Sequence, residues 1–431
     1  MSRVWSVDLG GFVGQRVELA GWLHHQRRLA QVSFALVRDG RGMSQVVVTD
    51  PDVRAALASW APETVLRVEG EVAAVPQAPA GLELHDPQFT VVSQPQGPLP
   101  FELRRPQLDV QLPTFLDHAA LGWRHPHQRA LGRVAAAAVW GFRSALEERK
   151  FVEIQTPKLV ASATESGANV FPVDYFGRRA FLAQSPQFYK QTMVGVYERV
   201  YETATVFRAE PHDTGRHLAE YFSLDAELGF ISDHREVMDL VGEVLAAMFA
   251  AGVERAAAAV DELDLKVPKV PAKIPSIDFL AAQELLENET GEKVVGESDL
   301  APAHERFLGK WAEREFASDL LFVVGYPMVK RPFYTHPDPD RPEFSNSFDL
   351  LFRGLEIVTG GQRLHRYQDY LEALEGQDVA PFQSYLQAFR YGMPPHGGFA
   401  MGLERLVARL AGASNVRQVT LFPRDLNRLE P

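Results

Sequence analysis

The sequence predicts an α+β protein in which a small N-terminal β-domain precedes a larger domain of mixed strands and helices. The chain has 431 residues, more than one ordinary hydrophobic core organises, so two or three domains are expected. Short strand-like segments fill the first 93 residues, a proline-rich segment follows, and long helical patterns appear only after residue 126. Because the all-strand part and the mixed part are separate along the chain, the α+β class is favoured.

The N-terminal domain, residues 1–93, is predicted to be a small barrel. Five segments alternate apolar and polar residues between turn signals, and a helix-like segment, 52–58, lies between the third and the fourth. Five short strands in so short a stretch are typical of an OB-fold, and a β-sandwich is the structural alternative. The five segments are 17–23, 32–37, 45–49, 66–72 and 89–92.

The next segment, residues 94–126, is predicted to be a hinge between domains. Prolines at positions 95, 98, 100, 106 and 113 interrupt it, and such a density of proline is not expected to sustain helices or sheet ladders. The remaining domain, 127–431, opens with an alanine-rich helical pattern over 127–150 that leads into a strand. Region 253–318 is predicted to form peripheral helices and shows no recognisable chemistry.

Composition narrows the class of protein. The net charge of −12 argues against indiscriminate nucleic-acid binding, although Arg27, Arg28, Arg38 and Arg41 form a local basic cluster. The absence of cysteine excludes disulfides, cysteine-bound zinc and thiol catalysis, so any metal would be held by oxygen or imidazole. No apolar run of about 18 residues and no secretory signal is present, so we expect a cytoplasmic protein without a membrane partner.

The segment 207–227 carries the clearest chemical information. Arg208 and Glu210 lie on one short segment, and Tyr221 and Asp225 lie on the next. Two strands joined by a loop would direct alternate side chains at one ligand. A guanidinium group for phosphate, an aromatic ring for a base and carboxylates for an amine suit a nucleoside triphosphate. The pattern therefore predicts an ATP-dependent activating enzyme.

Three segments resemble, in family order, the three motifs of class II aminoacyl-tRNA synthetases, and two more narrow the resemblance to aspartyl-tRNA synthetases of the compact archaeal and eukaryotic type. The resemblance implies an antiparallel catalytic sheet flanked by helices, ATP and Mg²⁺ in the reaction, an OB-fold that reads the anticodon, and a homodimer formed through residues 127–157. The five segments are 151–157 (motif 1), 184–191, 207–225 (motif 2), 354–365 and 397–406 (motif 3).

The resemblance implies an ATP site built mainly from motifs 2 and 3. Arg208 is expected at the α-phosphate and Arg405 at the γ-phosphate, and these two arginines are assigned as catalytic. Tyr221 shares strand parity with Asp225, so its ring is expected to face adenine while Phe222 faces the core. The residues expected at ATP are Arg208, Glu210, Arg216, His217, Leu218, Tyr221, Glu356, Gly402, Leu403, Glu404 and Arg405.

The resemblance also implies a cationic pocket for L-aspartate. Lys190 and Arg363 would face its side-chain carboxylate, because a neutral amide there would leave buried cations unpaired. Mg²⁺ prefers a few carboxylates plus phosphate oxygens and water, which suits Asp349 and Glu356 with the Thr359 hydroxyl. The residues expected at aspartate are Glu165 (a mobile lid), Gln187, Lys190, Arg208, Asp225, Thr359 and Arg363.

The spacing of Arg27, Phe34, Gln45 and Glu83 is similar to that of anticodon-binding relatives. An exposed aromatic ring can stack on an unpaired base, and glutamine can read a base edge through one donor and one acceptor. Phe34 could equally belong to the core, and the arginine and glutamine around it favour the anticodon role.

The choice of tRNA depends on the third anticodon base, which is cytosine in tRNA(Asp) and uracil in tRNA(Asn). The loop 75–80 with Pro76 contains no lysine or arginine, and His25 and His24 are the nearby imidazoles. We expect such a cleft to accept either pyrimidine, so that aspartate is placed on both tRNAs. Discrimination by backbone groups of the same loop is the alternative.

Two alternatives remain for the function. An asparaginyl-tRNA synthetase is disfavoured by Lys190, which is not expected in those enzymes. A catalytically inactive tRNA-binding paralogue is disfavoured because Arg208, Glu356 and Arg405 are all present. A class I synthetase is disfavoured by the absence of that class's signature segments.

Overall fold

The computed structural model describes residues 3–161 and 169–430. The chain divides into two compact units, Met1–Thr114 and Phe115–Pro431, which are described separately. No helix among the described residues is both long and apolar enough to cross a membrane.

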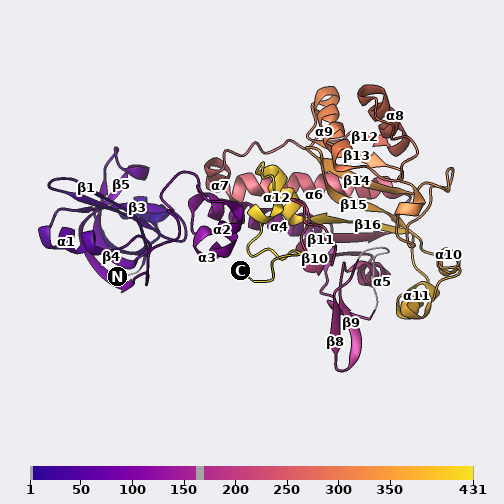
Figure 1. Ribbon diagram of the computed structural model, residues 1–431, viewed down its shortest axis with the longest axis horizontal. Coiled ribbons are helices and arrows are strands. Elements are labelled where there is room, and N and C mark those ends of the chain that lie inside the picture. Colours follow the sequence, from indigo (N-terminus) through magenta and orange to yellow (C-terminus); the bar gives the residue numbers. More distant parts are fainter. Residues whose placement is uncertain (1–2, 162–168, 431) are drawn as a thin grey trace. The chain divides into compact units, whose positions relative to one another are not determined.

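The first unit is a closed five-stranded barrel, and the OB-fold prediction is therefore confirmed over the sandwich (Figure 1). Strand order around the barrel is β1-β2-β3-β5-β4, and helix α1 (Pro51–Ser59) connects β3 to β4. Inward-facing residues such as Leu19, Val37, Val46 and Val68 are almost fully buried, because alternate residues of each strand face the barrel interior. The strands are β1 Arg16–Arg28, β2 Ser33–Arg38, β3 Met43–Val48, β4 Val65–Ala74 and β5 Leu82–Ser93.

The second unit is built on an eight-stranded sheet with the order β12-β13-β14-β15-β16-β11-β10-β6 (Figure 1). Its inner pairs are antiparallel, as expected, but the pairs at both edges, β12 with β13 and β6 with β10, are parallel, so the sheet is mixed. The strands are β6 Val152–Glu153, β10 Arg199–Phe207, β11 Glu220–Gly229, β12 Ser276–Asp278, β13 Leu320–Val324, β14 Ser347–Phe352, β15 Leu355–Arg363 and β16 His396–Gly402.

Helices α4 (Pro126–Glu148) and α6 (His234–Arg255) pack on one face of this sheet and enclose its main core. Phe142 of α4 contacts Phe399 of β16 and Tyr201 of β10 through edge-to-face rings. Most apolar residues of α4 are therefore buried within their own unit, whereas Trp140 is 42% exposed. Packing against the sheet thus explains most of the apolar character of this helix.

One expectation about local structure was wrong in part. Residues 94–111 form neither helix nor strand, but the rest of the predicted hinge forms α2 (Leu112–Asp117) and α3 (Ala119–Gly122). Pro113 is compatible with α2 because it lies in the first turn, where its missing N–H is not needed. The motif 1 strand is short, since only Val152–Glu153 pairs with β10.

Region 253–318 contributes α7 (Ala257–Glu262), α8 (Phe279–Thr290), α9 (Pro302–Phe316) and the edge strand β12. Helix α9 lies unusually close to the turn between β14 and β15. A Cβ atom on Gly309 would lie 2.4 Å from the backbone nitrogen of Gly354, so only glycine allows this approach. The consequence is that the first turn of α9 reaches the start of β15.

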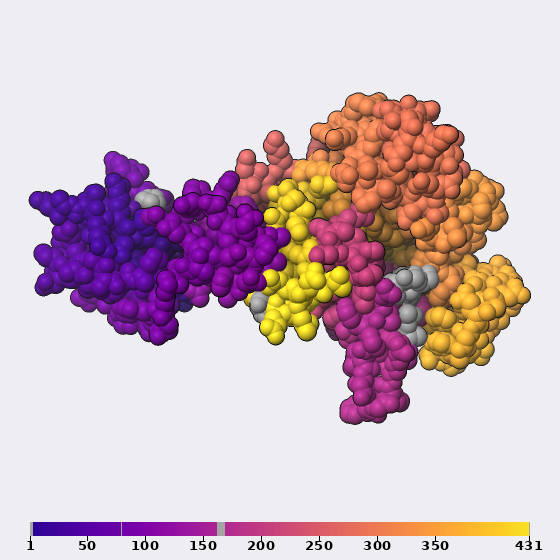
Figure 2. All heavy atoms as spheres, in the orientation of Figure 1, coloured from indigo at the N-terminus to yellow at the C-terminus, as the bar shows by residue number. Residues whose placement is uncertain are grey.

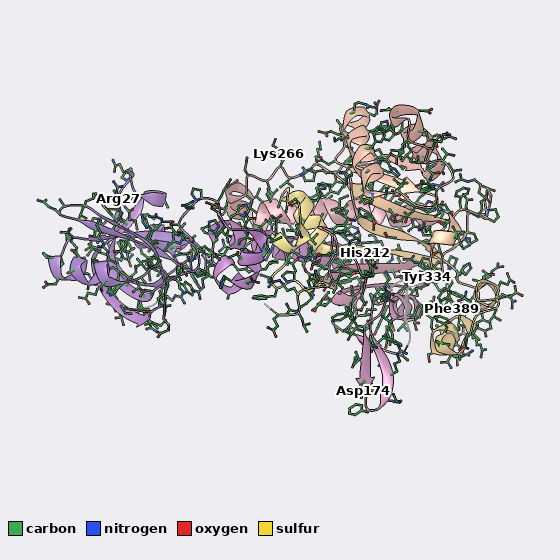
Figure 3. The ribbon with its side chains drawn as sticks, viewed as in Figure 1. Arg27, Asp174, His212, Lys266, Tyr334 and Phe389 are labelled. Carbon is green, nitrogen blue, oxygen red and sulfur yellow. The ribbon has the colours of Figure 1, made fainter. Side chains whose placement is uncertain are left out.

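A hairpin projects from the second unit and is the magenta lobe of Figure 2. It belongs to a small three-stranded sheet with the order β7-β9-β8. The sheet consists of β7 (Leu159–Val160), β8 (Pro172–Tyr175) and β9 (Arg178–Leu182), and Figure 3 labels Asp174 near the tip of the hairpin. Strand β9 leads directly into α5 (Gln187–Tyr197). The remaining helices are α10 Tyr367–Ala373, α11 Gln383–Arg390 and α12 Leu403–Leu410.

Candidate active site

A cavity of about 590 Å³ opens on the sheet face opposite α4 and α6. Its walls come from β11, β15, β16, the start of α12, the segment 330–332 and the loop between β10 and β11. Among its lining residues are Arg208, Glu210, Arg216, His217, Leu218, Tyr221, Glu356, Thr359, Gly402, Glu404 and Arg405. The fold thus gathers nearly all the residues that the sequence analysis assigned to ATP.

Strand register explains why these residues meet. Asp349 pairs with Thr359 across β14 and β15, Thr359 pairs with Ala400 across β15 and β16, and Ala400 pairs with Asp225 across β16 and β11. Directly paired residues of neighbouring strands point to the same face. The row therefore brings together carboxylates that are far apart in sequence.

Strand parity also separates Tyr221 from Phe222. The side chain of Tyr221 lines the cavity, whereas Phe222 packs against the main core on the other face. Leu403 was expected at the same site, but its side chain packs among apolar residues at the start of α12 and does not line the cavity.

Several cations converge on the cavity. Arg405 Nη1 lies 3.5 Å from Glu356 Oε1, and the Arg208 guanidinium lies 5.6 Å from the centre of the Tyr221 ring. Arg331, which no sequence motif indicated, lines the same cavity. The Nε atoms of Arg216 and Arg331 are buried and have no hydrogen-bond partner among the described residues. Buried N–H donors without acceptors suit an anionic ligand.

His217 faces the same group of charges. Burial lowers the pKa of His217 below its ordinary value, and the neighbouring Arg405 lowers it further. Its Nδ1 lies 2.7 Å from the Thr214 hydroxyl. A neutral imidazole at neutral pH can donate to or accept from a ligand without adding charge.

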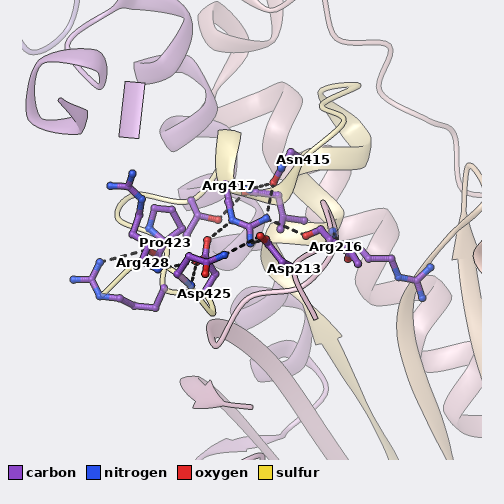
Figure 4. Close-up of polar contacts among 12 residues, drawn as sticks. Asp213, Arg216, Asn415, Arg417, Pro423, Asp425 and Arg428 are labelled. Carbon is purple, nitrogen blue, oxygen red and sulfur yellow. Dashed lines mark hydrogen bonds and ion pairs between the residues drawn. The ribbon is translucent and has the colours of Figure 1, made fainter. Parts of the chain in front are cut away.

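The loop that carries Arg216 and His217 is held from outside the cavity by Arg417 (Figure 4). This guanidinium is buried, donates to Asp213 Oδ1 at 2.8 Å, and pairs with the Asp425 carboxylate. The backbone N–H of Val416 donates to the carbonyl of the loop residue Gly215 at 2.8 Å. Residues from the C-terminal part of the chain therefore fix the backbone of the loop.

The acids assigned to Mg²⁺ form a pair across β14 and β15. Burial raises the pKa of Asp349 to about 6, although Arg331, 3.1 Å away, opposes that shift. Burial alone would raise the pKa of Glu356, but Arg405 and Arg216 hold it below its ordinary value. The Thr359 hydroxyl donates to Glu356 Oε1 at 3.0 Å. Two close carboxylates of this kind repel each other, so a cation between them would be stabilised.

Beside this row lies a buried group of four charges. Lys190 Nζ is 3.0 Å from Asp225 Oδ1 and 3.4 Å from Glu227 Oε2, and Arg363 Nε donates to Glu227 Oε1 at 3.0 Å. Burial alone would raise the pKa of Glu227, yet Arg363 and Lys190 hold it below its ordinary value. Both cations therefore already have a carboxylate partner in the structure, which no sequence pattern indicated.

A network of buried hydrogen bonds lies next to this group of four charges. Gln187, one of the residues expected at aspartate, donates from Nε2 to Gln191 Oε1 at 2.9 Å. Gln191 Nε2 in turn lies 3.2 Å from the Tyr370 hydroxyl and 3.0 Å from His396 Nε2. Burial lowers the pKa of His396 to about 4, so the ring is neutral. Its Nδ1 lies 2.9 Å from the Pro394 carbonyl, where only an N–H makes a hydrogen bond. Nε2 is then the acceptor for Gln191.

One assigned residue is not described by the structure, and several residues that contribute to the site had no signal in the sequence. Glu165 lies outside the described residues. Gln191 stood inside a quoted motif without a role. Arg331, Glu305 and Arg417 followed no recognisable spacing, because each meets its partner only through the tertiary fold.

The residues assigned to the anticodon share one face of the barrel. Arg27, labelled in Figure 3, pairs with Phe34 across β1 and β2, and Gln45 pairs with Glu83 across β3 and β5. Gln45 Nε2 donates to Glu83 Oε1 at 2.6 Å. His85 Nε2 lies 3.0 Å from Glu83 Oε2, which gives the Glu83 carboxylate two partners.

The expectation that His24 and His25 are the nearby imidazoles was incomplete, because His85 belongs to the same face. His24 itself is buried against Arg38, with 3.1 Å between its Nδ1 and Nη1 of the arginine. His25 pairs with Leu36 on the outer face, and Pro76 is exposed in the connection between β4 and β5.

Comparisons with known proteins agree with both units. The family described as "tRNA synthetases class II (D, K and N)" matches residues 112–426, and the family described as "OB-fold nucleic acid binding domain" matches residues 17–92. The chain is 46% identical to the aspartate–tRNA(Asp/Asn) ligase of Thermus thermophilus, with all of both chains covered. It is 38% identical to the aspartate–tRNA(Asp) ligase of Pyrococcus furiosus, with 97% of each covered.

Solved structures are similar over the whole chain. An asparaginyl-tRNA synthetase from Pyrococcus horikoshii, complexed with asparaginyl-adenylate, superposes with a TM-score of 0.93 at 30% identity and covers 100% of both chains. A putative aspartyl-tRNA synthetase from Leishmania major superposes with a TM-score of 0.90 at 28% identity, covering 100% of this chain and 94% of that one. Backbone shape alone therefore does not distinguish aspartate from asparagine.

The buried charges make a prediction about stability. Replacing Arg363 with methionine leaves the buried Glu227 with Lys190 as its remaining ion-pair partner among the described residues, so the free energy of unfolding should fall by about 3–5 kcal/mol. Arg366→Met is the matched control, because that exposed side chain pairs with Asp369 at the surface and should change stability by about 1 kcal/mol or less. Urea unfolding of the three proteins measures both values. Equal stability of the two variants would contradict the coupling of Arg363 to Glu227.

Proposed function

We propose that this chain, which belongs to the class II tRNA synthetases of the D, K and N group, activates L-aspartate with ATP and ligates it to both tRNA(Asp) and tRNA(Asn). The observation that carries the proposal is the buried pair of cations, Lys190 and Arg363, next to a cavity lined by arginines. Relatives named aspartate–tRNA(Asp/Asn) ligase, similar over the full length, support the same substrates.

The reaction has two steps. The α-carboxylate of aspartate attacks the α-phosphorus of ATP, pyrophosphate leaves, and aspartyl-adenylate forms. A terminal ribose hydroxyl of the tRNA then attacks the acyl carbon, loses its proton, and releases AMP. Negative charge spreads over the phosphoryl oxygens in the first step, so positioning and electrostatic stabilisation carry most of the catalysis.

Each phosphate contact is assigned to a group that faces the cavity. Arg208 orients the α-phosphate, Arg405 and Arg216 hold the outer phosphates, and Tyr221 stacks on adenine near Glu210. Arginine suits these places because its planar fork binds phosphate through two parallel hydrogen bonds. Arg331 also lines the cavity and lies 3.1 Å from Asp349, one of the two carboxylates assigned to Mg²⁺.

Mg²⁺ fits the acid pair better as part of a complex with ATP than alone. Among the described residues no cluster of three or more histidine, aspartate or glutamate side chains could hold a metal by itself. Asp349 and Glu356, with the Thr359 hydroxyl, would supply part of the coordination, and phosphate oxygens and water the rest. When bound, the ion neutralises charge that builds up on the leaving pyrophosphate.

Amino-acid selection follows from an exchange of partners in the four-charge group. The ammonium of aspartate takes Asp225 as its partner, and Lys190 then takes the side-chain carboxylate of the substrate in place of Asp225. Every buried charge keeps a partner. Asparagine brings the ammonium but no anion, so Lys190 would lose Asp225 without compensation, which is costly in a buried site. Gln187 bounds this pocket, and Glu165 remains the proposed lid over the ammonium.

The barrel is proposed to read the anticodon. Phe34 stacks on a base, and Arg27 neutralises a nearby phosphate. Because its amide nitrogen already binds Glu83, Gln45 has its Oε1 and second N–H free for the central uridine. The third base would meet His25, Pro76 and His85, none of which is a long cationic reader, so either pyrimidine is accepted. We place the activity in the cytoplasm, and cell fractionation tests that placement.

A homodimer through residues 127–157 is part of the proposal, and its support lies in β6. This two-residue strand ends the sheet, and Val152 on it is 39% exposed. A free sheet edge with an apolar residue is a surface that a second copy can cover.

The first test of the proposal is amino-acid-dependent exchange of pyrophosphate with ATP. Aspartate should support exchange and asparagine should not, because only aspartate replaces the carboxylate lost by Lys190. Lys190→Ala should abolish the exchange. Equal rates with both amino acids in the unmodified protein would remove the assignment.

Arg208→Ala and Arg405→Ala serve as companion variants in that assay. Loss of one preorganised electrostatic contact costs about 10²–10³-fold in kcat. A variant that melts at the normal temperature and keeps most of its activity would remove the role given to that arginine.

The second test compares kcat/KM for unmodified tRNA(Asp) and tRNA(Asn) transcripts. The two values should differ by less than about a hundredfold, near 2.7 kcal/mol, because stacking and the shared central uridine supply most of the binding. Gln45→Ala should lower both values alike, whereas Gln88→Ala, exposed on β5, should change neither. A larger preference for tRNA(Asp) would end the dual-specificity proposal.

The third test is sedimentation at micromolar concentration. The protein should have about twice the chain mass of 48.1 kDa. Val152→Glu should shift it toward the monomer by placing a charge on the sheet edge, and Val295→Glu, equally a surface valine, should not. A fully active monomer would contradict the dimer.

A further inference from the structure

Glu305 is an acid in the region 253–318, where no sequence pattern indicated any chemistry. It lies in the first turn of α9, and only 4% of its surface is exposed. The close approach of Gly309 to the Gly354 turn brings this part of α9 against the first residues of β15. A carboxylate buried in this way is costly unless its oxygens are paired and hydrogen-bonded.

Both carboxylate oxygens of Glu305 have partners at the active site. Oε1 lies 2.9 Å from Nη1 of Arg216, and Oε2 accepts the backbone N–H of Glu356 at 3.0 Å. One partner belongs to the loop expected to bind the outer phosphates, and the other is the backbone of Glu356 near the start of β15, one of the two acids assigned to Mg²⁺. Glu305 therefore connects two walls of the cavity without lining it.

Arg216 depends on this contact for its orientation. Its backbone position is fixed by neighbours, since Gly215 accepts from the Val416 N–H and Arg405 Nε donates to the Arg216 carbonyl at 3.4 Å. The guanidinium has Glu305 as its one ion-pair partner among the described residues. Its Nε remains buried without a hydrogen-bond acceptor. The pairing thus fixes the guanidinium by one nitrogen and leaves other donors for a ligand.

We propose that Glu305 is a positioning residue for the triphosphate: it holds the Arg216 guanidinium at the cavity wall and the backbone of Glu356 beside it. The inference rests on the proposed function, because it takes ATP as the ligand. A preorganised arginine binds phosphate without first losing side-chain freedom. Glu305 acts through Arg216 and touches no reacting atom.

The experiment measures aspartate-dependent pyrophosphate exchange for Glu305→Gln. KM for ATP should rise about tenfold or more, since displaced positioning groups cost up to about 10²-fold, while KM for aspartate stays unchanged. Glu313→Gln on the same helix is the matched control, because that side chain is exposed and should change neither constant. Calorimetric titration with ATP alone should reproduce the loss of affinity.

A double-mutant cycle with Arg216→Ala tests whether Glu305 acts through the arginine. In the Arg216→Ala background, Glu305→Gln should have almost no further effect on KM for ATP. If Glu305→Gln does not fold, Glu305→Asp, which keeps the charge on a shorter side chain, should show a smaller rise with the same pattern.

Three results would overturn the inference. An unchanged or lower KM for ATP would mean that Glu305 does not position Arg216 or instead withholds it from the ligand. A parallel loss for ATP and aspartate, together with a lower melting temperature, would assign a merely structural role. Full additivity in the cycle would remove the path through Arg216. Failure of the proposed function is distinguishable, because the unmodified protein would then show no aspartate-dependent exchange.

Discussion

The register of four antiparallel strands aligns the residues at the centre of the active site. Because β14, β15, β16 and β11 pair residue by residue, Asp349, Thr359, Ala400 and Asp225 form one row on one face of the sheet. A shift of one residue would turn the side chains of a whole strand to the helix-covered face. The main core, packed between the sheet and α4 and α6, prevents that shift. The packing of the core therefore also fixes the geometry of the site.

Charge balance is the second organising feature. Lys190 faces Asp225, Arg363 faces Glu227, and Arg216 faces Glu305, so the site can be buried before any ligand arrives. Arginine has five N–H donors, more than one carboxylate accepts. The donors that remain include the buried Nε atoms of Arg216 and Arg331 at the cavity. A site whose charges are paired in this way, and whose arginines keep further N–H donors, is suited to a highly charged anion.

The sequence predicted the fold class and the local geometry of motif 2 well, because both depend on short-range patterns. Strand alternation places Tyr221 and Phe222 on opposite faces in the structure, as expected. Contacts between distant segments could not be predicted in the same way. Glu305 meets Arg216 across 89 residues, and His85 reaches Glu83 only because the barrel turns its side chain to that face. The same holds for Lys190 of α5, whose carboxylate partners Asp225 and Glu227 come from β11.

Selection of the amino acid and selection of the tRNA depend on different kinds of interaction in the two units. The backbone is shared with an asparaginyl-tRNA synthetase at a TM-score of 0.93, so strictness toward aspartate has to come from a few charges. Buried charges serve that purpose because a missing partner there is expensive. The proposed charging of two tRNAs needs the opposite at the anticodon, where stacking on Phe34 would accept any base and Gln45 would demand a particular edge. Strict selection in the buried pocket and tolerant selection on the exposed face of the barrel would therefore be compatible within one chain.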